Sequence, residues 1–168
     1  NMPNLGWGSI TVPGAVSAWV ALSDRYGKLN FSELFDSAIH YAREGFLVGP
    51  KSAYYWQLLE NHYRDFKEFK KHFSPTPQAG ERFVRPDMVR TLELIAESEG
   101  ESFYQGELAD QMARSSKKAG GLLQKSDLEN HKVDWVTPIS QDYRGVSLHE
   151  IPPNGQGLAA QIALGILN

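Results

Sequence analysis

Residues 126–150 read SDLENHKVDWVTPISQDYRGVSLHE, and this stretch decides the fold class because its hydrophobic period changes along its length. Ser126–Glu129 matches a capping box and predicts the start of a short helix. From Val133 to Ile139, every second residue suits the buried face of a strand. Tyr143-Arg144-Gly145 predicts a turn, and residues 146–150 predict a second strand.

Upstream of this stretch, apolar residues recur at helical spacing and predict a helical region over residues 13–131. Proline and glycine punctuate it, since proline suits the first turn of a helix and glycine suits its end. The predicted helices begin after Pro13-Gly14, at a Ser32 cap, near Lys51, at Pro86 and after Gly106. Gly27, Gly45, Gly100 and Gly120 are the predicted stops.

The third of these helices is predicted from about Lys51 to Phe73, with room for one break. An aromatic and aliphatic stripe runs along it at helical spacing, which predicts a face buried in the core. Its members are Tyr55, Leu58, Leu59, His62, Phe66, Phe69 and Phe73.

The fold class predicted from these patterns is mainly α with two late β-strands, in a single domain over residues 1–168. The helical region covers 13–131, the strands lie at about 133–151, and a last helix covers 157–167. Two strands are too few for an independent sheet, so we expect partner strands from sequence outside this chain. Both ends of the chain read as interruptions, which predicts a piece of a larger protein.

Composition excludes several classes of protein. A net charge of −3 and a pI near 6.0 disfavour a nucleic-acid binder, and the basic run at Lys67, Lys70 and Lys71 is typical of a solvated helix face. The sequence has no cysteine, which excludes disulfides and thiol catalysis. No apolar run is long enough to predict a membrane span in this segment. Nothing in the sequence indicates a localisation.

The motif search finds no catalytic machinery. There is no nucleophile elbow, no His-Glu-x-x-His zinc motif and no phosphate-binding loop. The five histidines, at positions 40, 62, 72, 131 and 149, lack metal-ligand spacing and are predicted to be structural or exposed. We therefore predict no catalytic, substrate-binding or metal residue in this chain, and no cofactor.

One glycine motif imitates a dinucleotide fingerprint. Residues 155–160, Gly-Gln-Gly-Leu-Ala-Ala, follow a predicted strand and begin a predicted helix. Pro152-Pro153 precedes them, removes two N–H donors and stiffens the approach to the turn. A rigid turn is therefore the preferred interpretation over nucleotide binding.

Several segments, in order along the chain, carry a family resemblance. They are Val12-Pro13-Gly14, Tyr26-Gly27-Lys28-Leu29, Glu44-Gly45-Phe46, Phe103-Tyr104-Gln105-Gly106, Gly120-Gly121-Leu122, Tyr143-Arg144-Gly145 and Pro152-Pro153-Asn154-Gly155-Gln156-Gly157. In this order they resemble the γ-glutamyltranspeptidase family, most weakly from about Lys51 to Arg85. Asn154 stands where the family's turn has a third proline.

The resemblance implies part of an N-terminal nucleophile hydrolase with an αββα sandwich. Such an enzyme is an autoprocessing zymogen that cuts itself into a large and a small subunit. The new N-terminal threonine of the small subunit attacks a γ-glutamyl amide, with glutathione as the usual donor. The chain corresponds to the middle of the large subunit, so the nucleophile and the substrate-binding arginine lie outside it. Thr11, Thr76, Thr91 and Thr137 are internal and isolated.

These implications predict that the isolated chain is inactive and that its partners are the rest of the large subunit, the small subunit and, through exposed apolar surface, other copies of itself. A small-molecule γ-glutamyl substrate is expected for the parent enzyme. Two alternatives stay open. The parent is a related acylase of the same family, or the chain is a non-catalytic helical interaction module with Tyr54, Tyr55 and Trp56 as its contact surface.

Overall fold

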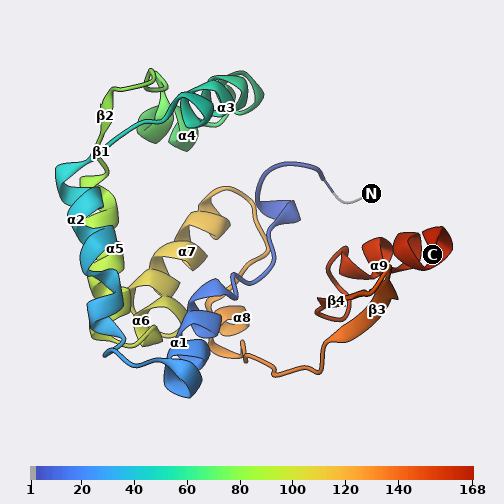
Figure 1. Ribbon diagram of the computed structural model, residues 1–168. Coiled ribbons are helices and arrows are strands. Elements are labelled where there is room, and N and C mark those ends of the chain that lie inside the picture. The colour runs from blue at the N-terminus through green and yellow to red at the C-terminus, as the bar shows by residue number, and fades with distance from the viewer. Residues whose placement is uncertain (1–2) are drawn as a thin grey trace. The chain divides into compact units, whose positions relative to one another are not determined.

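The computed structural model of the protein describes residues 3–168 and divides into two compact units (Figure 1). The first unit extends to His131 and is mostly helical, and the second comprises Lys132–Asn168. The assignment of residues 1–168 to a single domain stays a prediction. The mainly helical class with few strands is confirmed. No described helix is both long enough and apolar enough to cross a membrane.

The first unit follows the helix boundaries that proline and glycine predicted. Pro50 and Pro86 lie in the first turns of their helices, and Gly45, with a φ angle of 82°, is the C-cap of α2. Gly100, with a φ angle of 83°, lies three residues after the end of α5 and is the N-cap of α6. The elements are η1 (Trp7–Ser9), α1 (Ala15–Tyr26), η2 (Ser32–Phe35), α2 (Asp36–Glu44), β1 (Phe46–Leu47), α3 (Pro50–His62), α4 (Lys67–Phe73), β2 (Arg82–Phe83), α5 (Pro86–Glu97), α6 (Glu101–Tyr104), α7 (Glu107–Lys118) and α8 (Lys125–Glu129).

The core of this unit lies where α1, η2, α5 and α7 meet. Its buried side chains are Val16, Phe31, Phe35, Ile95, Ala96 and Leu108. The rings of Phe31 and Phe35 pack edge to face with their centroids 5.0 Å apart. Helices α2 and α5 lie side by side over this core (Figure 1).

A short ladder that the sequence did not predict connects this core to α3 and α4. β1 and β2 pair antiparallel, with Phe46 opposite Phe83 and Leu47 opposite Arg82. Figure 1 shows the ladder leading from the α2–α5 pair to α3 and α4. The Phe83 ring then contacts Trp56, at 4.7 Å between centroids, so the ladder also positions α3.

The predicted burial of the stripe on α3 and α4 is wrong for most of its members. Tyr55, Leu58, Leu59 and Phe66 are 60%, 52%, 39% and 38% exposed, and His62 is exposed as well. Only Phe69 and Phe73 are half-buried, where they stack on each other at 5.3 Å. Helical spacing indicates which face is apolar, but it does not show how far other elements cover that face.

The two predicted helix caps are also corrected. The capping box at the start of α8 is formed by Gln124 and Asp127 rather than by Ser126, and the Gln124 N–H donates to Asp127 Oδ2 at 2.8 Å. Ser32 makes no cap bond; the Asn30 N–H donates to the Glu33 carboxylate at 3.0 Å instead. In both places a carboxylate three residues further on satisfies the free N–H.

The second unit is a hairpin with one helix. β3 (Ile139–Tyr143) pairs antiparallel with β4 (Val146–Glu150), and α9 (Gly157–Leu167) packs on them. The predicted turn is confirmed: Arg144 and Gly145 have φ angles of 48° and 85°, typical of a two-residue hairpin turn. The first strand begins at Ile139 rather than near Val133, because Ile139 already faces Glu150, the last residue of β4.

Candidate functional site

Two of the family-like motifs meet in space at the start of α1. The Tyr104 hydroxyl, from the Phe-Tyr-x-Gly motif, accepts a hydrogen bond from the Ser17 N–H at 3.0 Å. It also donates to the carbonyl of Pro13, in the Val-Pro-Gly motif, at 2.8 Å. The N-cap residue of α1 is Gly14, which has no side chain to satisfy the free N–H groups of the first turn. Tyr104 therefore caps α1 from a distant part of the chain.

His131 joins this group and creates a serine–histidine contact. Its ring stacks on Tyr104, with centroids 5.1 Å apart and planes 20° apart, and its Nε2 lies 2.9 Å from Ser17 Oγ. Ser17 Oγ donates its only hydrogen to the Gly14 carbonyl, at 2.8 Å. With that hydrogen on the Gly14 carbonyl, the Ser17 oxygen is left as an acceptor for an N–H on His131 Nε2. We name these four residues, Pro13, Ser17, Tyr104 and His131, the α1 joint.

The contacts of the α1 joint connect the start of α1 to residues from two distant segments of the chain. Among residues 3–168, no carboxylate forms a hydrogen bond or ion pair with His131, so the orienting acid of a catalytic triad is not present in the described chain. The prediction that His131 is structural agrees with this geometry. The sequence did not indicate its partners, because serine, tyrosine and histidine here come from three separate segments.

Gly100 lies where the start of α6 approaches α1 closely. Gly100 has φ +83°, and a β-carbon there would lie 3.0 Å from Val16 Cγ1 and 3.1 Å from Val20 Cγ2. A side chain at this position would therefore strain the backbone and press on α1 at once. Gly100 lets the start of α6, which carries Tyr104, pack directly against α1.

A second polar cluster fixes the start of α5. Arg85 makes two hydrogen bonds to Asp87, at 2.9 and 2.8 Å, and its guanidinium lies 4.7 Å from the centre of the Phe73 ring. The Arg85 hydrogen bond lowers the pKa of Asp87 from 3.8 to about 2, with a smaller contribution from nearby His72. The two hydrogen bonds hold the Arg85 and Asp87 side chains together at the first turn of α5. No group of three His, Asp or Glu side chains suited to a metal ion occurs within residues 3–168.

The glycine motif of the second unit does not present an open anion site. A β-carbon on Gly157 would lie 2.6 Å from a carboxylate oxygen of Glu150, so this acidic side chain packs against the first residue of α9. A carboxylate at a helix N-terminus occupies the place where a pyrophosphate would bind. The geometry favours the rigid-turn interpretation of Gly155–Gly157.

Comparison with known proteins agrees with the motif pattern. The sequence model of the family described as gamma-glutamyltranspeptidase matches residues 1–168. A glutathione hydrolase proenzyme of Pseudomonas aeruginosa is 36% identical over 170 residues, covering 99% of this chain and 30% of the relative. The glutathione hydrolase-like YwrD proenzyme of Bacillus subtilis is 34% identical over 95% of this chain and 31% of its own length.

Solved structures give the same result. A cephalosporin acylase from Bacillus halodurans has a TM-score of 0.90 and 43% identity, covering 98% of this chain and 32% of that one. The γ-glutamyltranspeptidase of Helicobacter pylori has a TM-score of 0.85 and 29% identity, covering 93% of this chain and 46% of that one. The chain therefore belongs to the gamma-glutamyltranspeptidase family. It spans about a third of the length of the curated relatives it matches.

Proposed function

We propose that the chain is a non-catalytic segment of the large subunit of a γ-glutamyltranspeptidase-like enzyme. The parent enzyme would cleave or transfer γ-glutamyl groups through an N-terminal threonine that lies outside these residues. The observation that carries the proposal is the full-length family match combined with coverage of only about a third of each relative. The contacts of the α1 joint connect distant segments of the chain, which is consistent with a supporting role.

The unfinished surfaces of the second unit support this proposal. β3 and β4 form a sheet of only two strands, which is too small to be stable by itself. On α9, Ile162 and Ile166 are 55% and 78% exposed although the helix is strongly apolar. Further strands and helices of an αββα sandwich, contributed by the rest of the large subunit and by the small subunit, would cover these surfaces.

An acylase of the same family is the second candidate for the parent. The Bacillus halodurans structure described as a cephalosporin acylase is 43% identical to this chain, compared with 36% for the Pseudomonas aeruginosa glutathione hydrolase proenzyme. Both activities open an amide through an acyl-enzyme, so one scaffold segment serves either. Substrate preference would then depend on residues outside this segment.

A segment exchange tests the proposal. The chain replaces the matching segment of the Pseudomonas aeruginosa proenzyme, and the hybrid is assayed for self-cleavage into two subunits and for release of nitroaniline from γ-glutamyl-p-nitroanilide. We expect cleavage and turnover in the hybrid, because the chain supplies the same support as the segment it replaces. We expect no turnover from the purified 168-residue chain.

Two matched controls make the result specific. The hybrid with its host nucleophile replaced by alanine should stay uncut and inactive, whereas the unmodified host should be cut. Turnover by the isolated chain that survives rigorous purification would refute the proposal. A soluble hybrid that stays uncut while the host matures would also refute it.

A further inference from the structure

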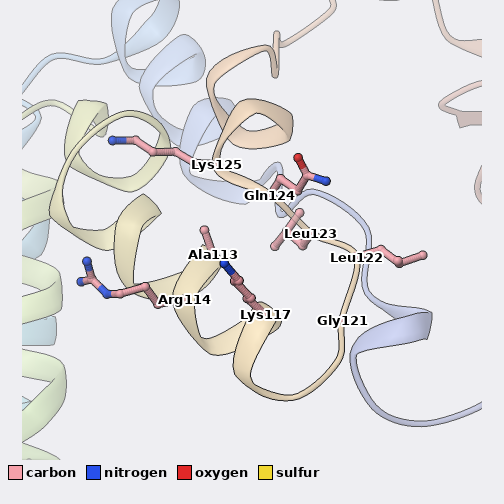
Figure 2. A pocket seen from close by; sticks show the side chains of 8 residues that line it. All are labelled: Ala113, Arg114, Lys117, Gly121, Leu122, Leu123, Gln124 and Lys125. Atoms are coloured by element: carbon pink, nitrogen blue, oxygen red, sulfur yellow. The ribbon is translucent and has the colours of Figure 1, made fainter.

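The C-terminal half of α7 and the segment that follows it enclose a hollow of about 490 Å³ (Figure 2). Ala113, Arg114 and Lys117 line it from α7. Gly121, Leu122, Leu123, Gln124 and Lys125 line it from the facing segment and the start of α8. A hollow of this volume is in the range that accommodates a small organic ligand.

The two walls are fixed to each other. The Gly121 N–H donates to the Ser116 carbonyl at 2.8 Å, which ties the segment to α7. A β-carbon on Gly121 would lie 2.6 Å from both Ser116 Oγ and Trp7 Cβ, so the chain passes here without room for a side chain. Leu123 is only 9% exposed, and the Gln124–Asp127 capping box holds the far end. The hollow is therefore preformed.

The three cations that line the hollow differ in how far carboxylates neutralise them. Lys125 Nζ lies 2.8 Å from Asp110 and 3.8 Å from Glu129, so its charge is shared with two carboxylates. Arg114 and Lys117 form no ion pair with any residue from 3 to 168. Arg114 is still close enough to Asp110 to help lower the pKa of that carboxyl, and the Asp127 carboxylate accepts from the Gln124 N–H at the rim, so Lys117 is the lining cation with no printed carboxylate partner among the described residues.

We propose that this hollow binds a monoanionic carboxylate with an apolar body. Arginine presents paired donors that match a carboxylate, and Lys117 adds a second cation on the same helix. Ala113 and Leu123 supply apolar wall for the remainder of the ligand. No residue of the α1 joint lines this hollow.

Calorimetric titration of the 168-residue chain with 4-phenylbutyrate tests the site. We expect Arg114→Gln and Lys117→Gln each to weaken binding about tenfold, which is the scale of one charge-assisted hydrogen bond. Lys118→Gln is the matched control, because it removes the same charge one residue further on without touching the lining. It should change the dissociation constant by less than about twofold.

Two ligand analogues separate the requirements of the site. Uncharged 4-phenylbutanol and the small anion acetate should each bind at least about tenfold more weakly than 4-phenylbutyrate, since one lacks the charge and the other the apolar body. Equal losses in the Arg114 and Lys118 variants, or equal binding of the alcohol, would overturn the proposal. So would binding that is present in the isolated chain but absent in the segment-exchange hybrid, because the hollow would then be covered by protein.

Discussion

Replacing Tyr104 with phenylalanine removes one oxygen atom and tests whether the α1 joint stabilises the first unit. The hydroxyl makes two hydrogen bonds, from the Ser17 N–H at 3.0 Å and to the Pro13 carbonyl at 2.8 Å. Each such bond contributes about 0.5–1.5 kcal/mol net, and loss of a helix N-cap costs about 1 kcal/mol. Because both partners are left half-buried without a replacement, we expect the free energy of unfolding to fall by about 2 kcal/mol.

Urea unfolding of the chain, followed by circular dichroism at the helical band, measures this loss. The signal reports mainly the first unit, which holds every described helix except α9. Tyr41→Phe is the matched control, because Tyr41 is 55% exposed and its hydroxyl makes no hydrogen bond with the described residues. It should cost less than about 0.5 kcal/mol. A loss of under about 0.5 kcal/mol for Tyr104→Phe, or equal losses for the two variants, would show that the joint is not a cap.

Three further changes test the packing, the backbone and the electrostatics by the same measurement. Leu128 is fully buried, so Leu128→Ala should lower the free energy of unfolding by about 3 kcal/mol. Leu122 is 83% exposed, so Leu122→Ala should leave the free energy of unfolding nearly unchanged. Similar losses for the two variants would contradict the burial of Leu128. Gly100→Ala should lower the free energy of unfolding more than Gly80→Ala, since both residues have φ +83° but only the first would meet neighbouring side chains. Equal losses would mean that backbone strain accounts for the whole effect and that the contact with Val16 and Val20 adds nothing. Asp87→Asn should cost about 1 kcal/mol at pH 6, allowing for solvent screening. Because the folded pKa of Asp87 is depressed from 3.8 to about 2, its contribution is complete above pH 4 and declines as the pH falls toward 2, so wild type and variant should converge there; a constant gap would contradict the ion pair.

The sequence was sufficient to predict those features of the fold that depend on a few neighbouring residues. Gly45 ends α2 with a positive φ angle, Arg144-Gly145 forms the hairpin turn, and the last helix occupies the predicted residues Gly157–Leu167. Each of these features depends on backbone sterics within a few residues. The predicted helix from about Lys51 to Phe73 allowed for one break, and the structure has that break between α3 and α4.

Features that depend on distant partners could not be predicted in this way. The β1–β2 ladder pairs two-residue strands on either side of α3 and α4, too short to show an alternating pattern. The stripe containing Tyr55 and Leu58 has helical spacing, but spacing carries no information about whether another element covers it. The resemblance identified the motif of Tyr104, whereas only the structure shows that this hydroxyl reaches Pro13 and Ser17.

Two of the family motifs meet at α1, and the two sides of this helix differ in burial. On one side it buries Val16 in the core and is capped by Tyr104. On the other, Trp19, Leu22 and Tyr26 are 48%, 50% and 64% exposed around an apolar hollow of about 510 Å³. An exposed apolar face of this kind is typical of a surface that another protein segment covers. Both partners of the Tyr104 hydroxyl lie within the described chain, so this cap on α1 does not depend on residues outside it. A defect in the joint should then reduce self-cleavage of the hybrid proenzyme even though no joint residue takes part in the chemistry.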